Sequence, residues 1–237
     1  MDPAAAIEIS DLHHRFHDGT VGLDGVTLVV REGQRLALLG ANGAGKTTLM
    51  LHLNGILRSH NGAVKVFGEP ISRESIKHVR STVGLVFQNP DDQLFCPTVY
   101  DDVAFGPQNM GLPPEQVERR VHESLREVGM EGAEGRNAFH ISAGEKKRVA
   151  LATVLAMDSR ILAFDEPTSN LDPRGRREFI ELLRGIGRTL IIATHDLGLV
   201  RELCDRAVVL SKGKIVADGE ADDILADAAL LRAHGLA

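Results

Sequence analysis

The stretch Leu36-Ala-Leu-Leu-Gly-Ala-Asn-Gly-Ala-Gly-Lys-Thr-Thr48 organises the chain. It is a short apolar run followed by a glycine loop, and then by Lys-Thr-Thr at the start of an apolar helical pattern. Gly40, Gly45, Lys46 and Thr47 fit the spacing G-x-x-x-x-G-K-[ST], which is typical of a loop that binds nucleoside triphosphates. A plain glycine turn between a strand and a helix is the alternative. The spacing, the Lys-Thr pair and the preceding strand-like run together favour phosphate binding.

The chemistry of phosphate binding accounts for these residue types. Glycines let backbone N–H groups approach a polyphosphate without an intervening Cβ atom, and a helix start presents its positive dipole end to the same anion. We expect Lys46 to reach the β- and γ-phosphates and the Thr47 hydroxyl to bind Mg²⁺. The other nucleotide contacts expected from this loop are Gly40, Asn42, Gly43, Gly45 and Thr48.

The composition is that of an ordinary soluble globular protein. The chain has 237 residues, of which 43% are hydrophobic and 25% charged, enough for one good core. A net charge of −6 is not typical of a nucleic-acid binder, so no nucleic-acid partner is expected. The two cysteines, Cys96 and Cys204, lie far apart and indicate neither a disulfide framework nor a zinc site. We expect no signal peptide and no membrane-spanning segment.

Apolar periodicity and turn residues predict strands that alternate with helices. Strands are expected at residues 7–16, 26–30, 35–39, 63–67, 81–88, 160–165, 189–194, 207–210 and 214–217, with a turn at 17–20. Helices are expected from the glycine loop to about residue 57 with Leu49, Leu53 and Ile56 on one face, at 98–105, from Pro114 through Val128, from 142 to about 157, at 173–186, at 197–204 and in the tail 220–237. This alternation implies an α/β fold with a mainly parallel sheet.

The chain is interpreted as a single domain, residues 1–237. A helical subdomain at about 90–157 is inserted into an α/β core of residues 1–89 and 158–219, and a helical tail follows at 220–237. The apolar stripe in the second of the inserted helices is expected to be core and not a partner site. It consists of Val117, Val121, Leu125 and Val128.

An apolar strand beginning at Ile161 ends in two adjacent carboxylates, Asp165 and Glu166. In a phosphate-loop enzyme this strand lies beside the first one, so Asp165 would hold Mg²⁺, directly or through water. Glu166, one residue further on, could polarise the attacking water. A strand ending in a polar turn is the alternative, since Asp-Glu-Pro fits a turn. The presence of the phosphate loop favours the catalytic interpretation.

The segment Ile141-Ser-Ala-Gly-Glu145 precedes another apolar helical run. Ser-x-x-Glu in this position is a capping box, in which the two side chains satisfy backbone N–H groups at the helix start. A capped helix start that contains glycine is also an anion site. The two interpretations are compatible, because the cap builds the site.

Six motifs therefore occur in one order: the phosphate loop, Gln88, the Ser-x-Gly-Glu helix start, Asp165-Glu166, Ser169-Asn-Leu-Asp172 and His195. From about residue 7 to residue 219 the chain resembles an ATP-binding-cassette (ABC) ATPase. The resemblance implies a P-loop NTPase core of RecA-like type, with N-terminal antiparallel strands and an inserted helical subdomain. It also implies ATP hydrolysis with ATP and Mg²⁺, in a pair of cassettes arranged head to tail.

The resemblance implies a role for each further motif residue. Ser142 and Gly144 would contact the γ-phosphate of the ATP held by the partner cassette. Gln88 resembles the loop glutamine that contacts Mg²⁺ or water and senses the membrane partner. Asp172 resembles the aspartate that couples the two sites, and His195 resembles the switch histidine that reaches the γ-phosphate.

Two positions need comment within this resemblance. Phe16 falls where the family usually places an aromatic residue that stacks on adenine, although Phe16 could equally be a core residue. The signature differs from the common Leu-Ser-Gly-Gly-Gln at Ile141, Ala143 and Glu145. Because the phosphate-facing serine and glycine remain, we expect the site to survive, while Glu145 adds negative charge near ATP.

The run Asn89-Pro-Asp-Asp-Gln-Leu-Phe95 is similar to that of energy-coupling-factor and cobalt/nickel importer ATPases. The segments 171–176 and 194–200 are similar to them as well. Judged from the residue types alone, Asp91-Asp92 is either a metal-binding pair or a solvated turn. Within the family, this segment lies where the coupling helices of the membrane subunit dock. The ten histidines show no ligand spacing, so the transported ion or vitamin would be bound by another subunit.

The expected function is that of an ATP-hydrolysing subunit of an importer for cobalt, nickel or a vitamin. Such a subunit is peripheral, on the cytoplasmic face of the cell membrane, and pairs with a second ABC ATPase subunit and with integral membrane transport subunits. A soluble ABC-type ATPase that acts on a nucleic-acid or ribosome machine is the alternative, and the acidic balance counts against it. A small-molecule kinase would leave Asp172 and His195 unexplained.

Overall fold

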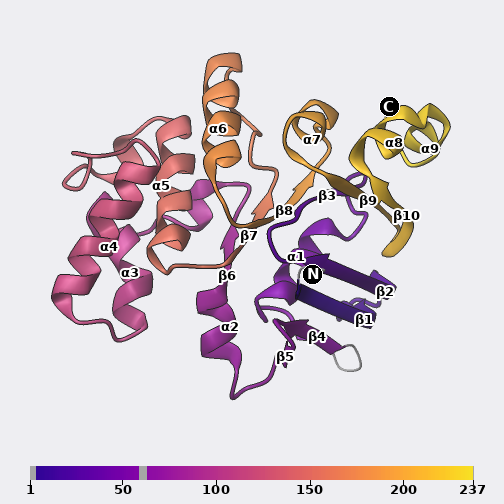
Figure 1. Cartoon of the computed structure of the whole chain (residues 1–237), viewed down its shortest axis with the longest axis horizontal. Coiled ribbons are helices and arrows are strands. Elements are labelled where there is room, and N and C mark those ends of the chain that lie inside the picture. The colour runs from indigo at the N-terminus through magenta and orange to yellow at the C-terminus, as the bar shows by residue number, and fades with distance from the viewer. Residues whose placement is uncertain (1–3, 59–62, 237) are drawn as a thin grey trace.

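The computed structural model describes residues 4–58 and 63–236, and in these residues a six-stranded and a four-stranded sheet form the framework (Figure 1). The larger sheet has the strand order β10-β9-β3-β8-β7-β6. All its neighbouring pairs are parallel except β10 with β9. Its strands are β3 (Arg35–Leu39), β6 (Val83–Val86), β7 (Ile161–Asp165), β8 (Thr189–Thr194), β9 (Arg206–Ser211) and β10 (Lys214–Glu220). The predicted α/β fold with a mainly parallel sheet is confirmed.

The smaller sheet is antiparallel, with the order β2-β1-β4-β5. Its strands are β1 (Ala5–Arg15), β2 (Val21–Arg31), β4 (Ala63–Val66) and β5 (Glu69–Pro70). The turn at 17–20 is confirmed, since the Phe16 N–H donates to the Thr20 carbonyl at 2.9 Å. The second strand was predicted to begin at Val26, but it begins at Val21 because the residues after the turn continue the pairing with β1.

Helix α1 (Lys46–Leu53) follows the glycine loop and lies between the two sheets (Figure 1). Leu49, Met50 and Leu53 pack in one apolar cluster with residues from both sheets. The prediction that α1 reaches residue 57 is wrong. Gly55 has a φ of +68°, a left-handed conformation that ends helices, and Ile56 beyond it is exposed rather than on the buried face.

Three helices lie together on the left in Figure 1, within the residues interpreted above as a helical subdomain. They are α3 (Val99–Asn109), α4 (Pro114–Glu127) and α5 (Ala143–Ala156). The apolar stripe of α4 is buried in the core, as predicted. The division into core, subdomain and tail remains an interpretation of the chain.

Helix α2 (Ile76–Thr82) corrects the predicted strand at 81–88. Only Ile76 and Val79 supply apolar spacing in this short helix, so periodicity did not reveal it, and the strand β6 begins only at Val83. The remaining helices agree with the predictions to within a few residues: α6 (Pro173–Gly185), α7 (Leu197–Leu203), α8 (Ala221–Ala226) and α9 (Ala228–Ala233).

The predicted single domain, residues 1–237, lies partly outside the described residues, at its two ends and at residues 59–62. Within residues 4–58 and 63–236, no helix has the length and apolar content needed to cross a membrane.

Candidate functional site

The glycine loop joins the carboxyl end of β3 to the start of α1. Gly45 has a φ of +108°, and a Cβ atom there would lie 2.5 Å from the Gly22 carbonyl oxygen. A Cβ atom at Gly40 would lie 2.5 Å from the Leu210 carbonyl oxygen. Side chains at these positions would force the loop away from its neighbours. The loop can therefore keep this close packing against β2 and β9 only with glycine at both positions.

Lys46 is 7% exposed and folds back over the loop. Its ammonium donates to the Gly40 carbonyl at 2.6 Å and to the Ala41 carbonyl at 3.3 Å. Both acceptors are neutral carbonyl oxygens, so neither bond pairs the ammonium with an opposite charge, and it remains available to an anion held in the loop.

Thr47 and Asp165 meet across the boundary between α1 and β7. The Thr47 hydroxyl donates to Asp165 Oδ2 at 2.7 Å. Burial raises the pKa of Asp165, because a carboxylate in a low-dielectric site is costly unless a cation is near. The pair thus presents two hard oxygen atoms, the ligand type that Mg²⁺ takes in combination with phosphate oxygens and water.

Glu166 directly follows β7, and its side chain contacts two residues at the end of β8. Its Oε2 accepts from the Thr194 hydroxyl at 3.0 Å, and its Oε1 lies 2.8 Å from His195 Nδ1. The side chain of Glu166 is buried, whereas His195 is largely exposed. Glu166 also has a φ of +45°, a strained conformation for a residue with a side chain and one that concentrates at functional sites.

A cavity of about 430 Å³ unites most of the predicted residues. Its size is that of a small-molecule site. Phe16, which is 41% exposed and so is not a core residue, lies at this cavity. The other predicted residues that line it are Asn42, Gly43, Gly45, Lys46, Thr47, Thr48, Gln88, Asp165, Glu166 and His195. Thr20, Val21, Gly22 and Ala44 line it as well and carried no motif signal.

Gly40 supports the loop from outside this cavity, through its carbonyl contact with Lys46. Among residues 4–58 and 63–236, no cluster of three His, Cys, Asp or Glu side chains is arranged to hold a metal ion.

Ser142, Gly144 and Asp172 are not brought to the glycine loop. They line a separate cavity of about 490 Å³, between the start of α5 and the start of α6. Asp172 caps α6, accepting from the Gly175 N–H at 2.7 Å. The chain thus carries a phosphate-loop half and a signature half in two different cavities.

The predicted capping box at the start of α5 is present. Glu145 Oε2 accepts from the Ser142 N–H and from the Ser142 hydroxyl, each at 2.8 Å. Glu145 Oε1 accepts from Arg136 at 2.7 Å. Arg136, followed by the bonds from Ser142, lowers the pKa of Glu145 to about 2. The extra negative charge foreseen at this position is therefore paired with a cation.

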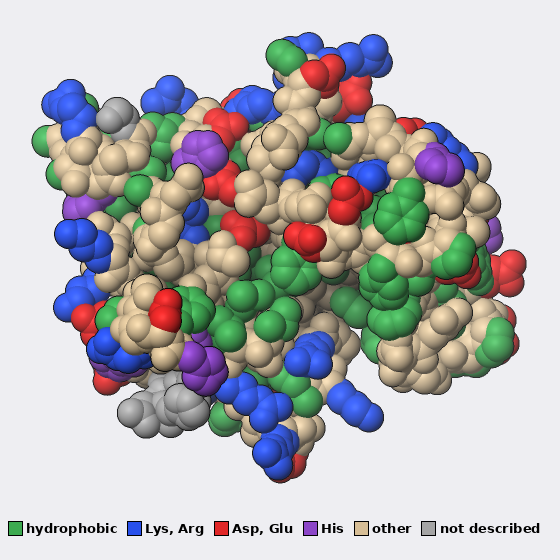
Figure 2. Space-filling model, turned by 180° about the vertical axis from the view of Figure 1, so that it is seen from behind, with side chains coloured by type: hydrophobic (Ala, Val, Ile, Leu, Met, Phe, Trp, Pro, Cys, Tyr) green, Lys and Arg blue, Asp and Glu red, His purple; other side chains and the backbone are tan. Residues whose placement is uncertain are grey.

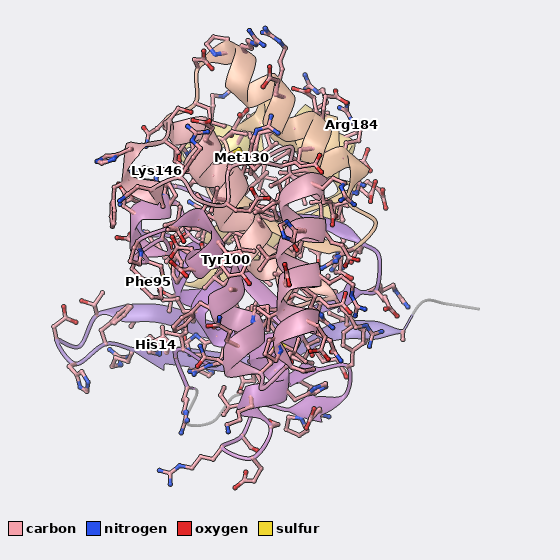
Figure 3. All side chains as sticks on the ribbon, turned by 90° about the vertical axis from the view of Figure 1, so that its left-hand side faces the viewer. His14, Phe95, Tyr100, Met130, Lys146 and Arg184 are labelled. Carbon is pink, nitrogen blue, oxygen red and sulfur yellow. The ribbon has the colours of Figure 1, made fainter. Side chains whose placement is uncertain are left out.

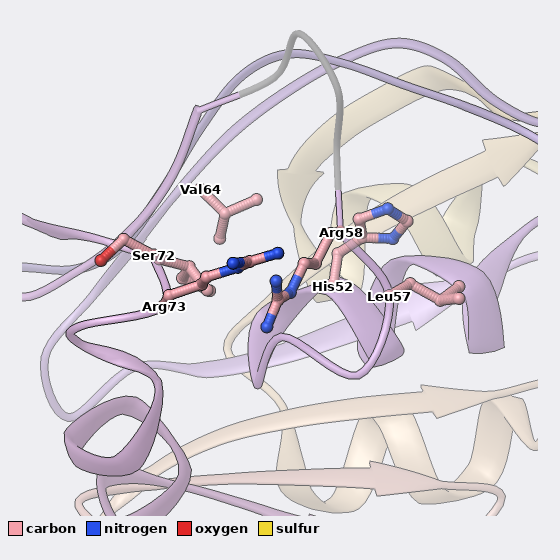
Figure 4. Close-up of a pocket in the computed structure, with 7 residues that line it drawn as sticks. His52, Leu57, Arg58, Val64, Ser72 and Arg73 are labelled. Atoms are coloured by element: carbon pink, nitrogen blue, oxygen red, sulfur yellow. The ribbon is translucent and has the colours of Figure 1, made fainter.

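Another cavity, of about 110 Å³, lies beyond the other end of α1, where Arg58 and Arg73 both enter it (Figure 4). No residue predicted for the nucleotide lines it. This cavity is separate from the cavity of the phosphate loop and from the cavity of Ser142, Gly144 and Asp172.

Sequence reasoning missed two residues that contact Glu166. Thr194, which is fully buried, donates to Glu166 and precedes the predicted histidine. Lys147 in α5 is also buried, and its ammonium lies against the backbone that follows β7. Both stand beside recognised motifs, but α5 is buried around most of its circumference, so periodicity could not mark Lys147 as inward-facing.

Comparison with known proteins agrees with this architecture. Residues 23–169 match the ABC transporter family. The energy-coupling factor transporter ATP-binding protein EcfA of Methanocaldococcus jannaschii is 49% identical over 235 residues, which cover 97% of this chain and 84% of that protein.

Two solved structures share the fold. CbiO1 from Clostridium perfringens, part of the ABC transporter complex CbiONQ, has a TM-score of 0.85 and 38% identity, over 98% of this chain and 95% of that chain. A dimeric ATP-binding cassette in a post-hydrolysis state with ADP and Pi has a TM-score of 0.81 and 22% identity, over 91% and 98% of the two chains. The chain therefore belongs to the ABC transporter family and is one of its ATPase cassettes.

Proposed function

We propose that the chain is the ATP-hydrolysing subunit of a membrane importer and that it works as one of a pair of cassettes. The observation that carries this proposal is the separation of the two half-sites. The phosphate loop lines one cavity, while Ser142 and Gly144 line another. An ATP molecule that requires both halves must therefore lie between two cassettes, which associate when it binds and separate after hydrolysis.

The proposal assigns the nucleotide to the cavity of about 430 Å³. Backbone N–H groups from Gly43 to Thr48 surround the phosphates, and the Lys46 ammonium moves from its carbonyl acceptors to the β- and γ-phosphate oxygens. Phe16 offers an aromatic face to adenine. The loop glycines leave room for the phosphates to approach the backbone, and Asn42 lines the same cavity.

Thr47, Asp165 and Gln88 are the proposed ligands of Mg²⁺, directly or through water. Bound there, Mg²⁺ would neutralise charge that develops on the β- and γ-phosphates. The observed 2.7 Å contact between Thr47 and Asp165 supports this assignment, because it already brings two oxygen ligands together.

Glu166 is the proposed residue that orients the attacking water, and His195 the residue that stabilises the γ-phosphate. Thr194 and His195 hold the two carboxylate oxygens of Glu166, which fixes its direction at the cavity. Ser142 and Gly144 act on the ATP of the partner, and Asp172 couples the two sites. Catalysis is then mainly positioning and electrostatic stabilisation.

The segment from Gln88 to Phe95 is the proposed contact with integral membrane subunits. Phe95 is exposed and packs its ring against that of Phe105 at 5.0 Å, edge to face. Figure 3 shows Phe95 and Lys146 on the side of the molecule that carries the three helices, and the Lys146 ammonium pairs with Asp91 at 2.6 Å. Figure 2 shows hydrophobic side chains around a hollow on the back face. Exposed apolar surface of this kind is typical of a protein interface.

The relatives support the importer class. One is named an energy-coupling factor transporter ATP-binding protein, and another forms part of the CbiONQ complex. We therefore propose uptake of cobalt, nickel or a vitamin, with the chain held at the cytoplasmic face of the membrane by its integral membrane partners.

The test is affinity purification of the tagged chain from detergent-solubilised membranes of its host, followed by mass spectrometry. The proposal expects a polytopic membrane protein and a substrate-binding integral subunit to be recovered in stoichiometric amounts. A matched preparation carrying Phe95→Asp controls for adventitious membrane proteins and should lose these partners while retaining ATP binding. Recovery of ribosomal or DNA-associated proteins, with the chain absent from membranes, would contradict the importer function but leave the ATPase activity intact.

A further inference from the structure

Lys147 is a lysine inside the protein. It lies in the second turn of α5 and is 4% exposed. Its ammonium donates to the Gln88 carbonyl at 3.1 Å, to the Glu166 carbonyl at 3.4 Å and to the Ser169 hydroxyl at 3.4 Å. These acceptors belong to two segments that meet only in the folded chain: the residues after β6, and the turn from Glu166 to Ser169 that follows β7.

Burying an ammonium group is costly unless its donors are satisfied. A position that required only packing would be filled equally well by methionine, which has a similar length and no charge. The charged group at position 147 is instead directed at backbone and hydroxyl oxygen atoms. The arrangement therefore indicates that the hydrogen bonds of Lys147 have a role, and not only the volume of its side chain.

The backbone of Glu166 is the part of this arrangement that needs support. Its φ of +45° is strained for a residue with a side chain. Its N–H donates to the Ala193 carbonyl at 2.8 Å. Its carbonyl accepts from the Ser169 hydroxyl at 2.8 Å as well as from Lys147. The peptide groups on both sides of the strained residue are thus held by neighbours.

We propose that Lys147, together with Ser169, is a positioning residue that holds the Glu166 carbonyl and ties it to the loop of Gln88. The two side chains do not touch ATP. They keep the Glu166 carboxylate directed at the cavity. Through its bond to the Gln88 carbonyl, Lys147 also connects the backbone of Glu166 to the segment proposed to contact the membrane subunits. This inference rests on the proposed catalytic role of Glu166.

The experiment measures kcat and KM for ATP with the purified full-length chain and four variants. Lys147→Met removes the donors but keeps most of the volume, and it should lower kcat about tenfold or more, since misplacing a catalytic group costs this much. KM should change by less than about threefold, because the residue makes no contact with ATP. Lys147→Gln retains an amide donor and should recover part of kcat. Lys77→Met makes the same change at an exposed lysine of α2 and should leave both constants unaltered.

A kcat for Lys147→Met within about twofold of the wild type overturns the proposal, as does a loss confined to KM. Ser169→Ala is the independent variant, because it leaves Lys147 in place and removes the other side-chain donor to the same carbonyl, together with one of the three acceptors of the Lys147 ammonium. It should lower kcat several-fold, and a normal kcat there also overturns the proposal, whether or not Lys147→Met folds. Absence of hydrolysis in the wild type would instead contradict the proposed function itself.

Discussion

His195 Nδ1 lies 2.8 Å from Oε1 of Glu166, although the two residues belong to loops that follow different strands. Strands β7 and β8 are parallel neighbours, so their carboxyl ends lie at the same edge of the sheet. One strand supplies the carboxylate and the next supplies the imidazole. The sheet order is therefore what brings the two side chains together.

Glu166→Gln is expected to reduce steady-state ATP hydrolysis by about a hundredfold or more, the usual contribution of a general base. The amide preserves the size of the side chain but cannot accept a proton from water. ATP should remain bound, so the variant should accumulate as an ATP-bound dimer. Phosphate release and size-exclusion chromatography with ATP measure the two effects.

The control for this variant is Glu127→Gln, which makes the same change on the exposed face of α4. It should hydrolyse ATP at the wild-type rate. Undiminished hydrolysis by Glu166→Gln would remove Glu166 from the proposed catalytic role.

Lys46→Ala is expected to weaken ATP binding by about tenfold to a hundredfold, which corresponds to the loss of hydrogen bonds to a charged group. The loop itself should persist, because its shape depends on glycine backbone and on packing against Leu210. Titration calorimetry with ATP measures the affinity, and Lys77→Ala is the matched control. An unchanged ATP affinity in Lys46→Ala would count against phosphate binding by this loop.

The separation of the half-sites leads to a mixing experiment. Lys46→Ala disables the phosphate loop, and Ser142→Arg places a bulky side chain at the signature half. Each variant alone should be nearly inactive, because every site in its homodimer has one defective half. In a mixed dimer both defects fall on one site and the other site is intact, so mixing should restore hydrolysis.

Circular dichroism establishes that both variants are folded before they are mixed, since Ser142→Arg also removes a helix cap worth about 1 kcal/mol. A mixture no more active than its components would contradict ATP sites shared between two copies of this chain.

How much of the structure could be predicted from the sequence depends on how far apart the interacting residues lie along the chain. The glycine loop and the strand ending in Asp165-Glu166 were recognisable because each motif is contiguous and its residue types are specific to one chemistry. The predicted strands and helices mostly agree with the structure for a similar reason, since apolar periodicity is local. The end of α1 at Leu53 was missed because Gly55 acts through a left-handed turn that composition alone does not reveal.

Lys147 illustrates the opposite case. Its ammonium is held by two segments, one at Gln88 and the other the turn from Glu166 to Ser169, which meet at α5 only in the folded chain. A lysine in a helix is ordinarily solvent-exposed, so the sequence favoured an exposed Lys147 over a buried one. Asp172 was noted for its family role, and its cap on α6 adds a structural function that the motif did not predict.

The ion pair between Glu145 and Arg136 gives a prediction about stability and pH. Arg136→Met removes the cation but leaves the capping bonds between Glu145 and Ser142. Because both partners of the pair are partly exposed, the loss in the free energy of unfolding at neutral pH should be no more than about 1 kcal/mol. Urea denaturation of the wild type and the variant measures it.

The pH dependence of that loss identifies its cause. The pKa of Glu145 is lowered in the folded chain from 4.5 to about 2. A lowered carboxyl pKa contributes stability that is fully present above the unfolded value and is lost as the pH falls toward the folded value. The difference between the wild type and Arg136→Met should therefore be constant above about pH 5 and shrink as the pH is lowered from there through about 2. A difference that stays the same across this range would mean that Arg136 stabilises the start of α5 by packing and not by its charge.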